Sequence, residues 1–365
     1  MASSRGSSLG LISLLSLVFV YFSIITTYSY DSAFVDAKPL NLPSTSSQLS
    51  KRTARTTAPA GALVVSKSPA SGQYSTVQAA VDALPDDGST QVIFIETGTY
   101  DEQVYIDRSG MLTILGETAN TANYASNVVT ITNSLSATAA GSDDASGTLR
   151  VHKDDFALYN INVKNTFGQG SQALALSAYG TNHGYYGVGF YSYQDTVLAE
   201  QGAQYYGYCY IEGAVDFIFG QHGFAFFQRS TIASVGPGTI TADGPSEKGD
   251  GLFVINESTI EQSAAATEDL TGLVYLGRPW TEYATVAFTS CTLGSVINSA
   301  GWEIWSTSEP NTEDVTFAEY DNGGAGSVGT RASFATKLTS NAGYTAAAVL
   351  GSTWTSWVDQ GYVDQ

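Results

Sequence analysis

The chain has 365 residues, which suits one large repetitive domain or two ordinary ones. An apolar share of 43%, with 22 Tyr and 16 Phe, excludes a disordered chain and favours β-strands. The formal net charge of −19, with only 15 Lys and Arg, leaves no basic face that could bind nucleic acid.

The N-terminal segment has the pattern of a secretory signal peptide. One basic residue, Arg5, precedes an apolar run at residues 11–25, which is somewhat short for a membrane span. We predict a signal peptide over residues 1–37, ending near the small residue Ala37, with an uncleaved anchor as the alternative. Residues 38–60 are rich in Ser, Thr and Pro and are predicted to be a linker or short propeptide. We therefore expect a secreted, extracellular protein without membrane contact once the signal is removed.

The folded domain is predicted to occupy residues 61–365. It opens with a short helix, for which Ser75 is the expected N-cap and Pro85 the end. Strand-forming sequence follows, beginning with QVIFIETGTYDEQVYI at residues 91–106. Ala-rich patches between residues 333 and 350 are predicted to form short helices on the flank of the domain.

The middle of the chain repeats itself. One column of aligned residues recurs at spacings of 27, 21, 21, 28 and 33 and consists of Ile161, Val188, Cys209, Ser230, Ser258 and Cys291. Two residues further on, on the same face of each strand, lies a second column: Val163, Phe190, Ile211, Ile232, Ile260 and Leu293. Matching rungs with loops of unequal length predict an all-β, right-handed, single-stranded parallel β-helix with short flanking helices. A β-sandwich is the weaker alternative, because it needs no matching rungs. A monomer is expected, since closed coils expose little sheet edge.

The same alignment predicts that the two cysteines are free. Cys209 and Cys291 lie three rungs apart, which is roughly 14 Å at about 4.8 Å per rung. A disulfide requires Cα atoms closer than about 7 Å. Two buried thiols are therefore expected.

Two aspartates occupy equivalent positions on adjacent rungs. Asp195 follows Val188 by seven residues, and Asp216 follows Cys209 by seven residues. Carboxylates on neighbouring rungs do not readily ionise together, so the pKa of one should rise and the pKa of the other should fall. This arrangement suits acid–base and nucleophilic catalysis. The alternative is a pair of solvated aspartates that cap strand ends.

Further polar residues lie in register with the pair. Gln194 precedes Asp195, and Gln172 lies about one rung earlier, so their amides could donate to an oxyanion. Arg278, two rungs beyond, could bind a carboxylate through two hydrogen bonds, and Trp280 offers a face for a sugar ring. A polar ladder and ordinary packing are the alternatives for the glutamines and for Trp280.

These motifs together resemble the pectin methylesterases (pectinesterases, carbohydrate esterase family 8). Five marks of that family stand in order: GTYDE (98–102), QALAL (172–176), YQDTV (193–197), DFIFG (216–220) and LGRPW (276–280). The short leader and the acidic charge resemble microbial, and particularly fungal, members. The family fold is a right-handed parallel β-helix, in agreement with the repeat.

The resemblance implies hydrolysis of C6 methyl esters of galacturonate in pectin, releasing methanol and pectate. It implies that Asp216 is the nucleophile, that Asp195 is the acid and then the base, and that Arg278 orients Asp216. The oxyanion would be stabilised by Gln172 and Gln194. Contacts to the sugar would come from Trp280, and from Trp302 and Phe219 in an aromatic lining. The resemblance implies neither a metal nor an organic cofactor.

Other functions are less well supported by the sequence. No G-x-S-x-G elbow is present in the predicted folded domain at residues 61–365, and the polygalacturonase-type set of NTD, DD and RIK motifs is incomplete, since NTD and RIK do not occur. Two alternatives remain: a β-helical relative that cleaves another acyl ester or thioester, and a non-catalytic β-helix that binds polysaccharide.

Overall fold

The computed structural model describes residues 54–122 and 124–363. The expected signal peptide and most of the expected linker lie outside these residues. Arg55, however, pairs with Thr118 in an antiparallel bridge, and its guanidinium donates to Gly116 O and to Asn160 Oδ1. The packed domain therefore begins before Gly61. No helix in the described part of the chain is long and apolar enough to cross a membrane.

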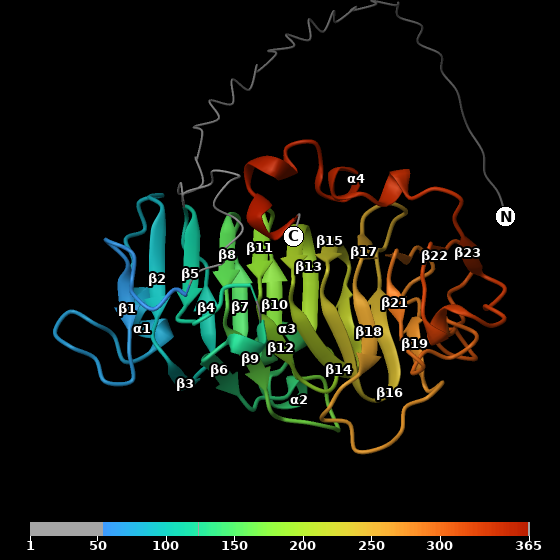
Figure 1. The fold of residues 1–365 in the computed structure, drawn as a ribbon, viewed down its shortest axis with the longest axis horizontal. Coiled ribbons are helices and arrows are strands. Elements are labelled where there is room, and N and C mark those ends of the chain that lie inside the picture. The colour runs from blue at the N-terminus through green and yellow to red at the C-terminus, as the bar shows by residue number, and fades with distance from the viewer. Residues whose placement is uncertain (1–53, 123, 364–365) are drawn as a thin grey trace, which may run out of the picture. The chain divides into compact units, whose positions relative to one another are not determined.

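The domain is a right-handed parallel β-helix with three faces, here called sheets A, B and C. In Figure 1 the strands stand side by side along the horizontal direction, so that each coil adds one rung to each sheet. β13 (Val197–Gly207), β14 (Tyr210–Gly220) and β16 (Thr231–Asp243) run from one face to the next without a break. Hydrogen bonds consequently connect all 23 strands of the described residues.

Sheet A contains the second half of β13 and ten other strands. These are β1 (Leu63–Val65), β2 (Gln91–Ile95), β5 (Leu112–Gly116), β8 (Phe156–Tyr159), β11 (His183–Tyr186), β15 (His222–Gln228), β17 (Leu252–Asn256), β20 (Thr285–Thr289), β22 (Thr316–Tyr320) and β23 (Ala335–Lys337).

Sheet B contains the first halves of β14 and β16, together with β3 (Gly98–Asp101), β6 (Val129–Asn133), β9 (Asn162–Asn165), β12 (Gly189–Tyr191), β18 (Thr259–Gln262) and β21 (Thr292–Leu293). Sheet C contains the first half of β13 and the second halves of β14 and β16, together with β4 (Val104–Ile106), β7 (Leu149–His152), β10 (Leu176–Tyr179) and β19 (Val274–Gly277). All pairings between these strands are parallel.

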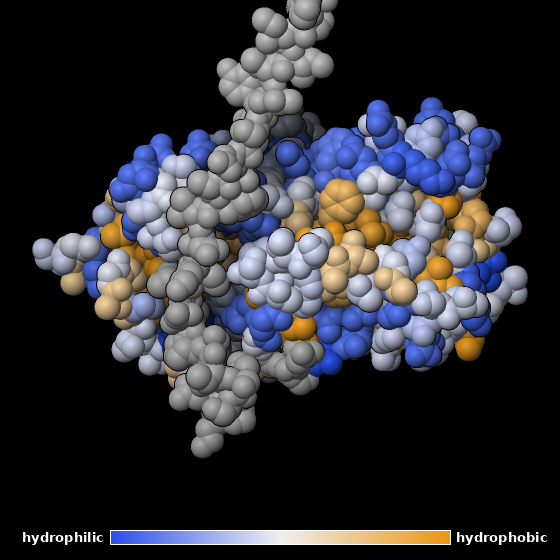
Figure 2. Space-filling model, turned by 90° about the horizontal axis from the view of Figure 1, so that it is seen from above, coloured by the Kyte–Doolittle hydropathy of each residue, from blue (hydrophilic) through white to orange (hydrophobic). Residues whose placement is uncertain are grey.

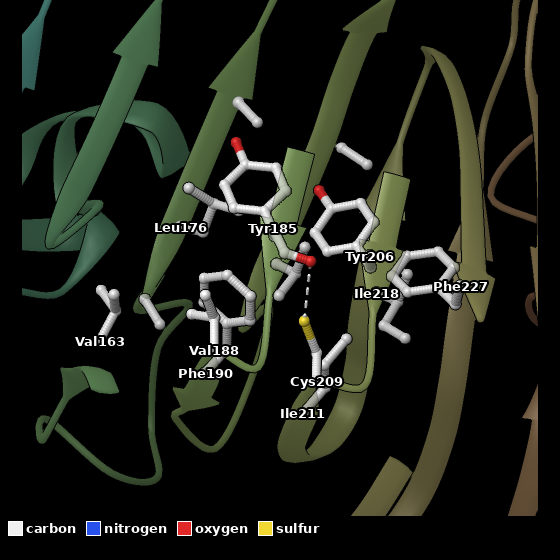
Figure 3. Close-up of a cluster of buried hydrophobic side chains, with 14 of the residues drawn as sticks. Val163, Leu176, Tyr185, Val188, Phe190, Tyr206, Cys209, Ile211, Ile218 and Phe227 are labelled. Carbon is white, nitrogen blue, oxygen red and sulfur yellow. Dashed lines mark hydrogen bonds between the residues drawn. The ribbon is translucent and has the colours of Figure 1, made fainter. Parts of the chain in front are cut away.

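The predicted columns form the interior. Phe190 pairs with Val163 on one side and with Ile211 on the other, and the register continues through Ile232 and Ile260. Each member of the second column is fully buried. Figure 3 shows Val163, Phe190 and Ile211 of this column following one another along the coils beside Tyr185, Tyr206 and Phe227. Burial of this continuous apolar interior is the main favourable contribution to folding.

Both cysteines are free and buried, as predicted. The Cys209 thiol donates to Tyr185 O at 3.3 Å, the contact drawn in Figure 3. The Cys291 thiol donates to Ile255 O at 3.2 Å. Burial raises the pKa of each thiol to about 12, so neither is a ready nucleophile.

Short helices flank the coils. They are α1 (Val77–Asp82), α2 (Ala137–Ala140), α3 (Asp143–Ser146) and α4 (Ala346–Leu350). The N-cap of α1 is Thr76, whose hydroxyl accepts from Ala79 N, so the expectation of Ser75 was wrong by one residue. Val77, Ala80 and Val81 of this helix belong to the interior cluster.

The C-terminal segment covers the outer face of sheet A, where it runs across the top of Figure 1. Val349 and Leu350 of α4 and, further on, Val358 and Tyr362 pack on that face. The expected helical patch on the flank is therefore present at α4, whereas residues 335–337 form β23 instead. In Figure 2, which shows this side of the molecule, orange apolar residues gather along the middle between blue polar margins.

Candidate active site

The two aspartates meet on the outer side of sheet C. Val197 pairs with Ile218, and two residues earlier in each strand the same register sets Asp195 beside Asp216. Adjacent parallel strands lie about 4.8 Å apart. Each aspartate is only 6% exposed. The predicted pairing of the two carboxylates on adjacent rungs is confirmed.

Both aspartates have left-handed backbone conformations. Their φ angles are 61° for Asp195 and 48° for Asp216. Asp tolerates this region better than most L-residues, but it is still unfavourable and persists only where the surroundings enforce it. Here the backbone N–H of Asp195 donates to Val215 O at 3.1 Å. The conformation turns each strand as it enters sheet C and carries the carboxylate out of the coil.

Arg278 holds the carboxylate of Asp216 in a two-pronged contact. Its Nε lies 2.9 Å from Oδ1, and its Nη2 lies 2.6 Å from Oδ2. Arg278 follows β19, which pairs with β16, which in turn pairs with β14. The arginine therefore comes from two rungs beyond Asp216, as the repeat predicted. The hydroxyl of Thr239 also donates to Asp216 Oδ1.

Asp195 has a different environment. Burial raises the pKa of its carboxyl well above the usual range, and the nearby charges of Asp216 and Asp143 raise it further. The charge of Arg278 and a hydrogen bond from Gln194 oppose this rise but do not reverse it. The surroundings of Asp195 therefore favour its protonated form, whereas the carboxyl group of Asp216 is bound to an arginine.

The two glutamines lie on adjacent coils where the chain enters sheet C. Gln194 O accepts from Ala173 N at 3.2 Å, which places the segments that carry Gln172 and Gln194 side by side on adjacent coils. The side-chain amide of Gln194 bonds to Asp195. Gln172 is held through its backbone oxygen, which accepts from Ala137 N of α2 at 2.8 Å.

An apolar strip lies next to the carboxylates on the outer face of sheet C. It consists of Leu174, Leu198, Phe219 and Ala242, on which Tyr179, Trp280 and Trp305 pack while remaining partly exposed. The Phe219 and Trp280 ring centroids are 6.2 Å apart. A Cβ on Gly244 would come within 2.6 Å of the Trp280 ring, so only glycine leaves room for it. Phe219 itself is 4% exposed and supports Trp280 from below.

The expectation that Trp302 lines the site was wrong. Trp302 is 1% exposed and stacks on Phe317 in the interior, with ring centroids 4.4 Å apart. Its indole nitrogen donates to Glu319 at 3.2 Å. Its backbone bridges to Gly277 as a continuation of sheet C, which directs the ring into the core. Trp305 lies at the site instead, with the Arg278 guanidinium 4.4 Å above its ring centroid.

Four residues near the carboxylates escaped the sequence analysis: Thr239, Asp143, Glu303 and Trp305. Asp143 begins α3 and raises the pKa of Asp195. Glu303 lies close enough to Arg278 and Asp216 to interact with their charges. None of them lies in a quoted motif. Glu303 and Trp305 closely follow Trp302 in the sequence, so the analysis reached this segment but selected the wrong tryptophan.

No three His, Cys, Asp or Glu side chains come together as candidate metal ligands within residues 54–122 and 124–363. The functional groups of the site are carboxylates, an arginine, amides and a hydroxyl. A parallel β-helix with such a pair of carboxylates on one outer face defines the class of β-helical hydrolases that can work through an aspartate nucleophile.

Comparison with known proteins gives the family. Residues 62–350 match the pectinesterase family. A pectinesterase of Aspergillus aculeatus is 54% identical over 84% of this chain and 94% of its own length. The structure of the pectin methylesterase from Aspergillus niger has a TM-score of 0.79 and 41% identity, covering 85% of this chain and 100% of that one. The pectin methylesterase from carrot has a TM-score of 0.75 at 27% identity, covering 85% and 98%. The chain therefore belongs to the pectinesterase family of carboxylic ester hydrolases.

Proposed function

We propose that the chain hydrolyses the C6 methyl esters of galacturonate residues in pectin by way of Asp216 and Asp195. The observation that carries this assignment is the contrast within the buried pair. Asp216 is held by the two hydrogen bonds of Arg278, whereas burial raises the pKa of Asp195. One carboxylate is thus prepared to attack and the other to give up a proton.

In the first half of the reaction, an oxygen of Asp216 attacks the ester carbonyl carbon, and the π electrons move to the carbonyl oxygen. The amides of Gln172 and Gln194 donate to this oxyanion. The tetrahedral intermediate collapses with cleavage of the bond to the methoxy group, which takes the proton of Asp195 and leaves as methanol. The product is an anhydride between Asp216 and the galacturonate, with Asp195 now ionised.

In the second half, Asp195 accepts a proton from water, and the oxygen of that water attacks the galacturonate carbonyl carbon of the anhydride. The intermediate collapses to a free galacturonic acid and the carboxylate of Asp216. Asp195 is protonated again, so the enzyme returns to its starting state with one water consumed. Trp280 and the neighbouring Trp305 offer aromatic faces on which the sugar rings of the polymer can pack.

The decisive test is methanol release from highly methylated pectin by the wild type and by Asp216→Ala. Asp321→Ala is a matched control, because Asp321 has a similar φ of 50° but lies exposed at a turn. We expect a loss of about 10⁴-fold or more in Asp216→Ala and little change in the control. Circular dichroism and thermal melting verify folding. Activity that survives in a folded Asp216→Ala would refute the assignment, and an inactive wild type would direct attention to another acyl ester or to polysaccharide binding.

We further propose a preference for highly methylated pectin. The net charge of −19 repels a polyanion, and methylation masks the carboxylates of the polymer. Initial rates measured on pectins of decreasing methylation should fall, and the fall should be steeper at low salt. A rate that rises as methylation decreases contradicts this preference.

We also propose that the protein is secreted and acts as a monomer. The support is the apolar run at residues 11–25 and the closed coils of the domain. N-terminal sequencing of protein from culture medium and its sedimentation in solution test the two statements separately. A mature N-terminus at Met1, or a dimeric sedimentation coefficient, would contradict them.

A further inference from the structure

Thr239 lies directly beneath the carboxylate of Asp216. It belongs to the part of β16 in sheet C, where its Cα pairs with that of Val215, and it is 2% exposed. Its neighbour Ile240 is fully buried among the interior residues. Because successive side chains of a strand point to opposite faces, Thr239 points outward, under the site.

The hydroxyl of Thr239 makes two hydrogen bonds to the same residue. It accepts from the backbone N–H of Asp216 at 3.3 Å and donates to Asp216 Oδ1. The direction of each bond follows from the donors available. The backbone amide can only donate, so the Thr239 oxygen accepts from it, and the Thr239 O–H donates to the carboxylate. Thr239 thus clamps backbone and side chain of a residue whose φ is 48°.

The hydrogen bonds distinguish the two oxygens of Asp216. Within the described part of the chain, Oδ1 accepts from Thr239 and from Arg278 Nε, whereas Oδ2 accepts only from Arg278 Nη2. A carboxylate has about four lone-pair positions, two on each oxygen. Both positions of Oδ1 are therefore occupied, and one position of Oδ2 remains for a new bond.

We propose that Thr239 is a positioning residue that makes Oδ2 the attacking atom of Asp216. The inference rests on the proposed function. Oδ2 forms the bond to the ester carbonyl carbon, the π electrons of that carbonyl move to its oxygen, and Oδ1 becomes the second carbonyl oxygen of the anhydride. Thr239 and Arg278 Nε keep their bonds to Oδ1 throughout, so the carboxylate does not have to reorient during attack.

The test compares Thr239→Val, which keeps the shape and loses the hydroxyl, with Thr239→Ser, which keeps the hydroxyl. For Thr239→Val we expect a fall in kcat of about ten- to a hundredfold with KM nearly unchanged, because one hydrogen bond to a charged group is lost. Thr239→Ser should restore kcat to within about threefold of the wild type.

The matched control is Thr289→Val. Thr289 is also fully buried, and its hydroxyl bonds to Asn256 Oδ1 at 2.7 Å in sheet A, away from the carboxylates. This variant measures the effect of losing a buried strand hydroxyl away from the carboxylates. Its kcat should stay within about threefold of the wild-type value.

A crystal structure of Thr239→Val supplies a readout that does not depend on activity. We expect the Asp216 carboxylate to rotate away from its present contacts with Arg278. An unmoved carboxylate would overturn the proposal, and so would equal losses of kcat in the Val and Ser variants. The proposed function fails on a different result, namely methanol release by Asp216→Ala.

Discussion

The outer faces of sheets A and C both carry apolar side chains, but they are covered in different ways. On sheet A, rings such as Tyr159, Tyr186 and Tyr205 lie beneath the C-terminal segment of the same chain. On sheet C, the aromatic side chains that pack on Leu198, Phe219 and Ala242 remain partly exposed. An apolar strip on the outside of a β-helix is therefore not a site in itself. What makes the strip on sheet C a site is the pair of carboxylates beside it.

The largest loss of activity is expected from Asp195→Asn. This substitution leaves the apolar strip of sheet C intact and removes the proton donor beside it. The rate of methanol release should fall by about 10²- to 10⁴-fold. In the wild type, kcat/KM should decline as the pH rises through the raised pKa of Asp195, because the protonated form is needed. That basic limb should vanish in the variant. A limb that persists would assign the proton to another group.

The same substitution has an opposite effect on stability. Asp195 binds its proton more tightly in the folded than in the unfolded chain, so its contribution to stability is complete below about pH 4. This contribution is lost as the pH rises toward the folded pKa. Since Asn cannot ionise, Asp195→Asn should melt about 2 °C or more above the wild type at pH 7. The difference should disappear near pH 3, and calorimetry at both pH values checks the sign.

On sheet A, Tyr362→Ala should expose part of the outer face without changing the catalytic groups of sheet C. Tyr362 is 6% exposed, its hydroxyl donates to Thr121 O, and its carbonyl oxygen accepts from the hydroxyl of Tyr205. We expect a loss of about 3 kcal/mol in the free energy of unfolding, with kcat of the folded fraction unchanged. Tyr362→Phe, which loses only the hydroxyl, should cost about 1 kcal/mol. A large fall in kcat would mean that the two faces are coupled.

Trp280→Ala is the corresponding change on sheet C. We expect kcat/KM for pectin to fall about tenfold, mainly through KM, because an aromatic face for the sugar is lost. The melting temperature should change less than in Tyr362→Ala, since Trp280 is only partly buried. Trp280→Phe should recover most of the loss. If stability falls and KM does not change, Trp280 is a packing residue like those under the C-terminal segment.

The smallest effect is expected at Asn256, which begins the sequence Asn256-Glu257-Ser258 typical of N-glycosylation. Its amide donates to Gln228 and accepts from Thr289, at 2.7 Å each. It also lines a cavity with Tyr344 and Trp354 of the covering segment. We therefore expect no glycan there, and the intact masses of wild type and Asn256→Gln should differ only by the side-chain change. A glycan removed by the substitution would contradict this.

The sequence predicted those features that depend on counting residues along the repeat. Asp195 and Asp216 share one offset from Val188 and Cys209, so their pairing followed from the columns alone. Thr239 escaped because the register between β14 and β16 shifts on either side of Val215, so a count of twenty-one does not lead to it.

Trp302 was misassigned for a related reason. β21 has only two residues, and in the described part of the chain sheet C continues beyond β19 as two isolated bridges, at Ile297 and Trp302. With so little regular strand, no alternation in the sequence indicates which side chain faces inward. The three-dimensional stacking on Phe317 decides it.

The lengths of the coils also bear on how such an enzyme can diverge. The coils that carry the two aspartates are the shortest of the aligned set, twenty-one residues each, and longer coils precede and follow them. One inserted residue between Asp195 and Asp216 would turn a carboxylate toward the interior. Residues added to a loop that carries no residue of the site, such as the loop between β18 and β19, leave that pairing untouched. Evolution and protein engineering can therefore reshape the surroundings of the bound polymer by lengthening loops, while the reacting centre is inherited unchanged.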